Sequence, residues 1–285
     1  MYLYGVNNRN MTDIKHKNIS TIESKILARL IETGKNWFTV SDVYSRFTEL
    51  SENALRLQLM RMTDDGLLMR VREGVYYIIP YEQNSETFMP DWHLMAEPLA
   101  GQNHYIGYYS ALQIHQLITQ PSLKEQIVVP KQIKPSETTI KNVKFQFIYH
   151  NKKHFFGYKK VWIDNFNRVW CSDLEKTIID CLYKPDYAGG IVEIAKAIFM
   201  AKDKTNFETL LNYTIRFDSQ SVIKRLGYLL ELLEIETPII ETLQKQRSNS
   251  ISILDTETPK GGKILSRWNI QQNMDTETIK NSILT

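Results

Sequence analysis

Polar and basic side chains that could bind a polyanion recur in one short part of the sequence, residues 51–74. Arginine guanidinium groups bond to phosphates and to the edge of guanine, and short polar side chains bond to phosphates or bases. Such chemistry requires that the side chains face outward from one rigid element. The candidate residues are Ser51, Asn53, Arg56, Arg61, Arg70 and Arg72.

Capping residues and apolar periods typical of helices occur around these residues in the sequence. Ser20 and Glu23 have the spacing of a capping box, in which both side chains satisfy free amides at a helix start. A second short helix is predicted from Thr39, and a third from the cap Ser51 to Gly66. Apolar residues in the third helix recur at i, i+4 and i+7, which predicts one buried side. They are Leu55, Leu59 and Met62.

The spacing of apolar residues along the sequence changes after the third helix. Residues 67–79 hold two β-prone runs around Gly74, a pattern typical of a hairpin. Three helices followed by a hairpin is the order of a winged helix-turn-helix domain, which we expect over residues 19–80.

This arrangement would place the polar side chains where nucleic acid could reach them. With the apolar stripe in the core, Asn53, Arg56 and Arg61 lie on the outer faces of the third helix and could reach base edges in a major groove. Arg70 and Arg72 lie near the hairpin tip, where a wing would meet the DNA backbone or minor groove.

The balance of charges in this segment lowers the affinity for DNA that we expect. The four arginines of residues 51–74 are matched by four acidic residues, Glu52, Asp64, Asp65 and Glu73, so the segment is neutral. Since non-specific affinity depends mainly on neutralised phosphates, one such module should bind weakly, and pairing on repeated sites would help. The alternative is a winged helix used for protein contact, with its arginines on a solvated face.

The remaining chain mixes short strands with periodic helices. We expect a frayed segment 1–18, a polar connector 81–103, and a second α/β domain 104–285 with a small sheet and a helical bundle, giving an α+β protein overall. Strands are predicted at 127–129, 145–149, 161–163 and 168–170. Capping boxes are predicted at 172–175 and 205–208. Gly227, inside a helix, suggests close helix packing.

Several other chemistries find no support in the sequence. The net charge is only +3, and no run approaches the roughly 20 apolar residues that span a bilayer. Of the six histidines, only His150 and His154 are spaced like half a zinc site, and no cysteine pair accompanies them. No phosphate-binding glycine motif occurs. We expect a cytoplasmic protein without metal, cofactor or enzymatic activity, in which Cys171 and Cys181 are core thiols.

Taken together, five segments of this chain resemble the AbiEi-type antitoxins and transcriptional regulators of abortive-infection (type IV) toxin–antitoxin systems. The segments are residues 67–76 (LLMRVREGVY), 108–112 (YYSAL), 172–180 (SDLEKTIID), 189–193 (GGIVE) and 224–231 (KRLGYLLE). Their order and spacing carry the resemblance, which extends over nearly the whole chain after residue 18.

The resemblance implies two activities. The winged helix would repress its own operon by binding inverted repeats in promoter DNA through Arg56, Arg61, Arg70 and Arg72; Glu73 departs from the basic residue expected there. The second domain would counteract a nucleotidyltransferase-like toxin encoded nearby, in bacterial defence against phage. The toxin could be countered directly or indirectly, and the protein would be a monomer that can pair on DNA. Exposed basic positions on C-terminal helices are the candidates for the antitoxin surface: Lys176, Lys224 and Arg225.

Two other classes remain open from the sequence. One is a one-component transcriptional regulator whose C-terminal domain senses a small molecule. The other is a nucleic-acid-processing enzyme, suggested by Asp164, Asp173, Glu175 and Lys176. Adjacent helical residues such as Glu175 and Lys176 point to different faces, which argues against the enzyme.

Overall fold

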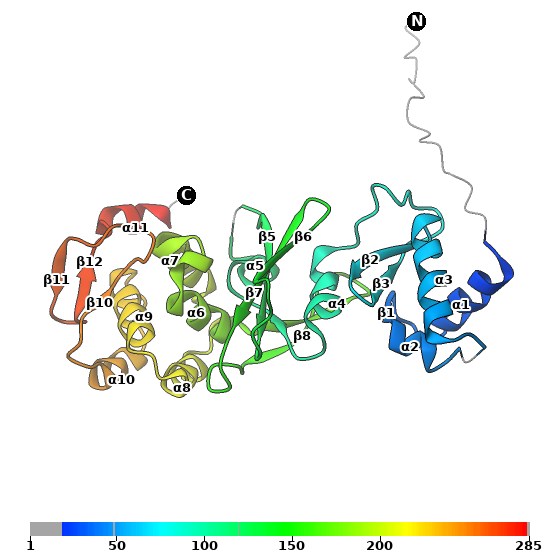
Figure 1. The fold of residues 1–285 in the computed structure, drawn as a ribbon. Helices are drawn as coiled ribbons and strands as arrows, with labels where there is room; N and C mark the ends of the chain where they lie inside the picture. Colours follow the sequence, from blue (N-terminus) through cyan, green and yellow to red (C-terminus); the bar gives the residue numbers. More distant parts are fainter. Residues whose placement is uncertain (1–18, 48, 119, 284–285) are drawn as a thin grey trace, which may run out of the picture. The chain divides into compact units, whose positions relative to one another are not determined.

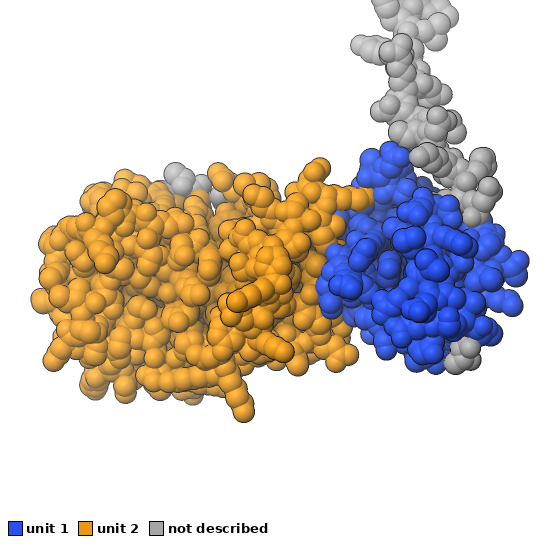
Figure 2. Space-filling model, viewed as in Figure 1, with its two compact units in different colours: residues 1–91 blue, residues 92–285 orange. Residues whose placement is uncertain are grey.

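The computed structural model describes residues 19–47, 49–118 and 120–283. The chain divides into two compact units, residues 1–91 and 92–285, coloured separately in Figure 2. The fold is mixed α+β, with several small sheets. Residues 1–18, expected to be frayed, lie outside the described residues.

Over residues 19–47 and 49–91, the first unit contains three helices and a three-stranded antiparallel sheet (Figure 1). The elements are α1 (Thr21–Ile31), β1 (Trp37–Thr39), α2 (Val40–Tyr44), α3 (Glu52–Asp64), β2 (Leu68–Arg72) and β3 (Val75–Ile78). The predicted caps are confirmed, because Ser20, Thr39 and Ser51 each accept a hydrogen bond from the backbone three residues on. The hairpin β2–β3 is also confirmed. Strand β1 was not predicted; it pairs with β3 and gives the sheet order β1-β3-β2.

The second unit begins earlier than predicted. Residues 92–103, expected as part of the connector, form the 3-10 helix η1 (Trp92–Met95) and α4 (Ala96–Ala100) and belong to this unit. The expectation was wrong because this polar, proline-containing stretch buries its apolar residues. Those residues are Met95, Ala96 and Leu99.

A six-stranded mixed sheet forms the first part of the second unit, with the order β6-β7-β5-β4-β9-β8. Its strands are β4 (Tyr105–Ile106), β5 (Lys124–Val129), β6 (Glu137–Ile140), β7 (Val143–Tyr149), β8 (Tyr158–Trp162) and β9 (Arg168–Ser172). The predicted runs 127–129, 145–149 and 168–170 are thus confirmed within longer strands, whereas the run 161–163 extends one residue past the end of β8. Helix α5 (Tyr108–Ile114) contacts both β5 and the first helix after the sheet.

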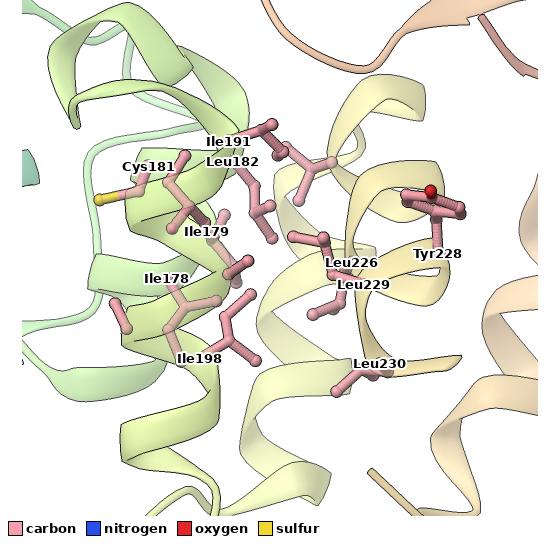
Figure 3. Packing of buried hydrophobic residues seen from close by; sticks show 14 of the residues in the cluster. Ile178, Ile179, Cys181, Leu182, Ile191, Ile198, Leu226, Tyr228, Leu229 and Leu230 are labelled. Carbon is pink, nitrogen blue, oxygen red and sulfur yellow. The ribbon is translucent and has the colours of Figure 1, made fainter. Parts of the chain in front are cut away.

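A helical assembly follows the sheet in sequence and gathers beside it in Figure 1. Its elements are α6 (Leu174–Tyr183), η2 (Pro185–Tyr187), α7 (Gly190–Ala201), α8 (Phe207–Phe217), α9 (Gln220–Leu232), α10 (Ile239–Gln246), β10 (Ser252–Ile253), β11 (Lys263–Leu265), β12 (Ile270–Gln272) and α11 (Thr276–Ser282). Burial of the apolar faces of α6, α7 and α9 forms the main core, shown in Figure 3, where Leu182 faces Leu226.

Two predicted helix caps are each displaced by one residue. Asp173, not Ser172, caps α6, and Asn206, not Thr205, caps α8. In both cases two neighbouring side chains are able to cap, and the hydroxyl of Thr205 instead donates to the carbonyl oxygen of Ala201 at 2.9 Å. The hydroxyl of Ser172 instead lies 2.7 Å from that of Thr177.

Gly227 is closely packed, but the prediction of a helix as its neighbour was wrong, because the contact comes from a residue between β11 and β12. A Cβ atom added there would overlap the ring of Trp268, which is buried. Cys171 and Cys181 are free, buried thiols, as expected. Within the described residues, no helix combines the length and the apolar character needed to cross a membrane.

Candidate nucleic-acid interface

Helix α3 has a fully buried side and an exposed polar side, as its sequence period predicts. Leu55, Leu59 and Met62 have no exposed surface. Asn53, Arg56 and Arg61 are exposed, so the structure places them on one outward-facing surface. The core of the first unit therefore fixes the orientation of the candidate side chains.

Ser51 is the N-cap residue of α3. Its Oγ accepts a hydrogen bond of 3.3 Å from the backbone nitrogen of Ala54. The hydroxyl hydrogen is still able to donate, so the cap does not prevent a bond to a phosphate. Asn53 lies exposed in the same first turn, where backbone N–H groups and the helix dipole favour an anion.

Arg56 and Arg61 have different surroundings. The Nε and Nη2 atoms of Arg56 donate to Oε1 of Glu52 at 3.1 and 2.7 Å. Both side chains of this pair are about half exposed, so water screens the attraction and a phosphate could displace Glu52. Among the described residues, none forms an ion pair with Arg61.

Two apolar side chains lie between these polar residues on the outer side of α3. Leu57 and Met60 each expose 55% of their surface. Apolar groups in this position can contact the methyl group of thymine in a major groove. The sequence prediction gave these two residues no role, although their positions off the buried stripe were the available signal.

The hairpin exposes the two remaining arginines along β2. Arg70 and Arg72 are exposed, whereas Val71 between them is buried and lies at a register shift in the pairing with β3. Only Glu73 and Gly74 separate the strands, and Gly74 has a φ of 69°. The turn is therefore short, and it brings Arg72 to the tip of the hairpin.

The three residues predicted to form an exposed antitoxin surface are buried, so that prediction was wrong. Lys176 and Lys224 have no exposed surface, and Arg225 exposes 2%. Basic residues on helices are usually solvated, and the sequence does not show which of them meet acceptors inside the fold.

Lys176 belongs to a buried network that ties α6 to the sheet. Its Nζ donates to Oδ1 of Asp180 and, at 3.0 Å, to the hydroxyl of Tyr105. The Tyr105 hydroxyl in turn donates to Oδ2 of Asp180 at 3.0 Å. Burial lowers the pKa of Lys176 and raises that of Asp180, and each charge opposes the shift of the other.

His150 completes this network. Its Nδ1 lies 3.2 Å from the Tyr105 hydroxyl and its Nε2 lies 2.7 Å from the hydroxyl of Tyr108. Tyr105 donates its only proton to Asp180, so its hydroxyl oxygen can only accept from His150. A neutral imidazole protonated at Nδ1 therefore donates to Tyr105 through Nδ1 and accepts from Tyr108 through Nε2. Burial, supported by the charge of Lys176, lowers the pKa of His150 to about 2. His154 stacks on Phe217 at 3.8 Å between ring centroids.

Arg225 and Lys224 bind backbone carbonyl groups of α6 and of the segment that follows α10. Arg225 donates to Leu182 at 2.7 Å and to Ile253 at 2.9 Å. Lys224 donates to the carbonyl group of Ser250 and, at 3.0 Å, to its hydroxyl. Burial lowers the pKa of Arg225 to about 10, a value at which it remains charged. These residues hold the second unit together.

An open pocket of about 600 Å³ lies elsewhere in the second unit. The rings of Tyr109 and Tyr187 and the side chains of Lys124 and Lys144 contribute to its wall. The two lysines are register partners on the parallel strands β5 and β7. The sequence does not predict this pocket, because its wall comes from segments far apart in the chain.

Comparisons with known proteins identify a shared fold. No protein-family model matches this chain, and the search of curated proteins gives no significant match. Among solved structures, the chain is similar to the crystal structure of the RV2827C protein from Mycobacterium tuberculosis, with a TM-score of 0.67 and 14% sequence identity. The likeness covers 94% of this chain and 97% of that one. At this identity, the likeness establishes the fold alone.

Proposed function

We propose that residues 19–80 form a winged helix-turn-helix domain that binds duplex DNA with α3 in the major groove. The observation that carries the proposal is the outward side of α3, where Asn53, Arg56 and Arg61 are exposed opposite a fully buried stripe. The order of helices and strands and the antiparallel sheet order β1-β3-β2 also agree with a winged helix.

The roles of the side chains follow from their positions. Arg56 and Arg61 would bind guanine edges or phosphates, Asn53 and Ser51 would bind at the start of the helix, and Arg70 and Arg72 would bind backbone at the hairpin. Because the basic and acidic charges of residues 51–74 cancel, one copy has little general attraction for DNA. Two copies on an inverted repeat would supply the affinity, and occupancy of such an operator in the promoter would repress the protein's own operon.

Replacing Arg56 and Arg61 together by alanine is expected to abolish the gel shift of the protein's own promoter fragment. Each well-placed base contact contributes roughly 1–3 kcal/mol, so losing two weakens binding at least about thirtyfold. The matched control is Lys25→Ala with Lys35→Ala, which removes two exposed positive charges of the same unit away from α3 and the hairpin. Equal binding by the Arg56/Arg61 variant and the wild type would show that α3 does not bind DNA.

For the second unit, the proposal is an antitoxin that counteracts a nucleotidyltransferase-like toxin encoded nearby. It rests on the AbiEi resemblance of four segments of this unit, including residues 172–180 and 224–231. The division of the chain into two compact units agrees with separable activities. The burial of Lys176, Lys224 and Arg225 means that other residues would contact any partner.

Co-expression tests this role. The neighbouring reading frame is expected to arrest growth alone, and both the full chain and a chain starting at Asp91 are expected to restore growth. The shorter chain lacks α3, so its success would separate toxin neutralisation from repression. If neither chain restores growth, the antitoxin proposal fails.

A second candidate is a one-component regulator that senses a small molecule, and the pocket beside Tyr109 and Tyr187 favours it. Its volume of about 600 Å³ lies in the range of small-molecule sites. A metabolite that raises the melting temperature and also releases promoter DNA would favour this regulator over the antitoxin.

A further inference from the structure

The hairpin formed by β8 and β9 displays aromatic rings and cations on one face. Along β8 the residues of this face are Lys160 and Trp162, and along β9 they are Arg168 and Trp170. Trp170 is the register partner of Lys160, and Arg168 is the register partner of Trp162. Residues two apart in a strand share a face, so the four side chains alternate ring and cation in both directions.

Each cation lies over the ring of its register partner. The Cζ atom of Arg168 is 3.9 Å from the centroid of the Trp162 ring, and Nζ of Lys160 is 5.4 Å from that of Trp170. Trp162 nevertheless exposes 56% of its surface. The cations therefore hold the rings in place and leave them open to a ligand.

The ring of Trp170 at the inner end of this face is linked through Tyr158 to the core of the second unit. Tyr158 stacks on buried Tyr105 at 5.1 Å, and Trp170 meets Tyr158 edge-on at 5.7 Å. Beyond Trp162, the turn presents Phe166, which is 88% exposed. Asp164 fixes this turn, because its carboxylate accepts hydrogen bonds of 2.7 Å from the backbone nitrogens of Phe166 and Asn167.

The position and charge of the hairpin favour an anionic, ring-containing partner. Strand β8 is the edge of the six-stranded sheet, so no further strand of the described part of the chain pairs with it on that side. Residues 158–170 contain three cations, Lys159, Lys160 and Arg168, and a single acid, Asp164, whose carboxylate is occupied in the turn.

We propose that this hairpin platform (Lys160, Trp162, Phe166, Arg168 and Trp170) binds a single-stranded nucleic acid. Exposed rings stack on unpaired bases and neighbouring cations bind the phosphates between them, the combination used by proteins that bind single strands. A duplex keeps its bases stacked inside and offers them to no ring. An acidic peptide would match the cations but would leave Trp162 and Phe166 without partners. The inference is independent of the proposed role of α3.

The test is fluorescence anisotropy of a labelled 12-nucleotide oligouridine with the full chain at low salt. Trp162→Ala is expected to weaken binding about tenfold, whereas Trp162→Phe, which keeps a ring, should retain most of it. Arg168→Gln should reduce the slope of log K against log salt by about 0.7 if that cation binds one phosphate.

Matched controls lie in the same unit. Tyr149→Ala removes an exposed ring from β7, and Lys202→Gln removes a cation that lies 4.1 Å from the Phe199 ring centroid. Both should bind the oligonucleotide as the wild type does, and so should the Arg56/Arg61 alanine variant. The proposal is overturned if the wild type does not bind at 100 µM, if Trp162→Ala binds normally while folded, or if a 12-residue polyglutamate competes as well as oligouridine.

Discussion

Replacing Lys176 by methionine is expected to lower the free energy of unfolding by about 3–5 kcal/mol. The substitution keeps most of the side-chain volume but removes the positive charge beside Asp180, whose carboxylate is completely buried. Asp180 would keep only the hydrogen bond from Tyr105 and would have to remain charged without a partner or take up a proton. Urea unfolding followed by circular dichroism at pH 7 measures the loss.

Two further variants separate the charge from the packing. Lys176→Met combined with Asp180→Leu removes both charges, and it should recover a large part of the stability lost by Lys176→Met alone. Lys153→Met breaks the exposed ion pair with Asp218, which measures 2.6 Å, and should leave the unfolding midpoint unchanged. A double variant as unstable as the single one would show that the unpaired carboxylate of Asp180 does not cause the loss.

Gly227→Ala is expected to destabilise the protein by about 1–3 kcal/mol, the usual cost of overfilling a core. In an open helix the same change would stabilise by about 1 kcal/mol, because alanine is the better helix former. Here the added methyl group would overlap the six-membered ring of Trp268. That ring cannot easily move, since its Nε1 donates a 2.7 Å hydrogen bond to Glu231 and the side chain is 1% exposed.

The control for this prediction is Gly261→Ala, at a glycine where an added Cβ would meet no atom within 4 Å. It should leave the midpoint of thermal unfolding unchanged. Combining Gly227→Ala with Trp268→Leu should give a smaller loss than the sum of the two single losses, because the overlap is relieved. Strict additivity would contradict the proposed contact.

The first unit was predicted closely because its signals are local. The recurrence of Leu55, Leu59 and Met62 fixed which side of α3 is buried, and therefore which side carries Arg56 and Arg61. The cap residues and the glycine turn marked the ends of the elements. Strand β1 escaped prediction because three residues are too few to show a period, and its pairing with β3 depends on residues nearly forty positions away.

In the second unit, long-range contacts decided what the sequence left ambiguous. The spacing of Lys176 and Asp180 is common on solvated helices, and only the approach of Tyr105 from the sheet makes it a buried pair. The hairpin platform likewise required the register between β8 and β9, which places each cation over a ring.

By itself, the sequence determined the longer helices, the hairpin of the first unit and the outward side of α3, because helical and strand periods are properties of neighbouring residues. The tertiary structure decided which charged residues are buried, why Gly227 has no side chain, and which rings remain exposed beside cations. These properties depend on the burial of groups by partners distant in sequence, and burial determines whether a charge costs free energy or is simply solvated.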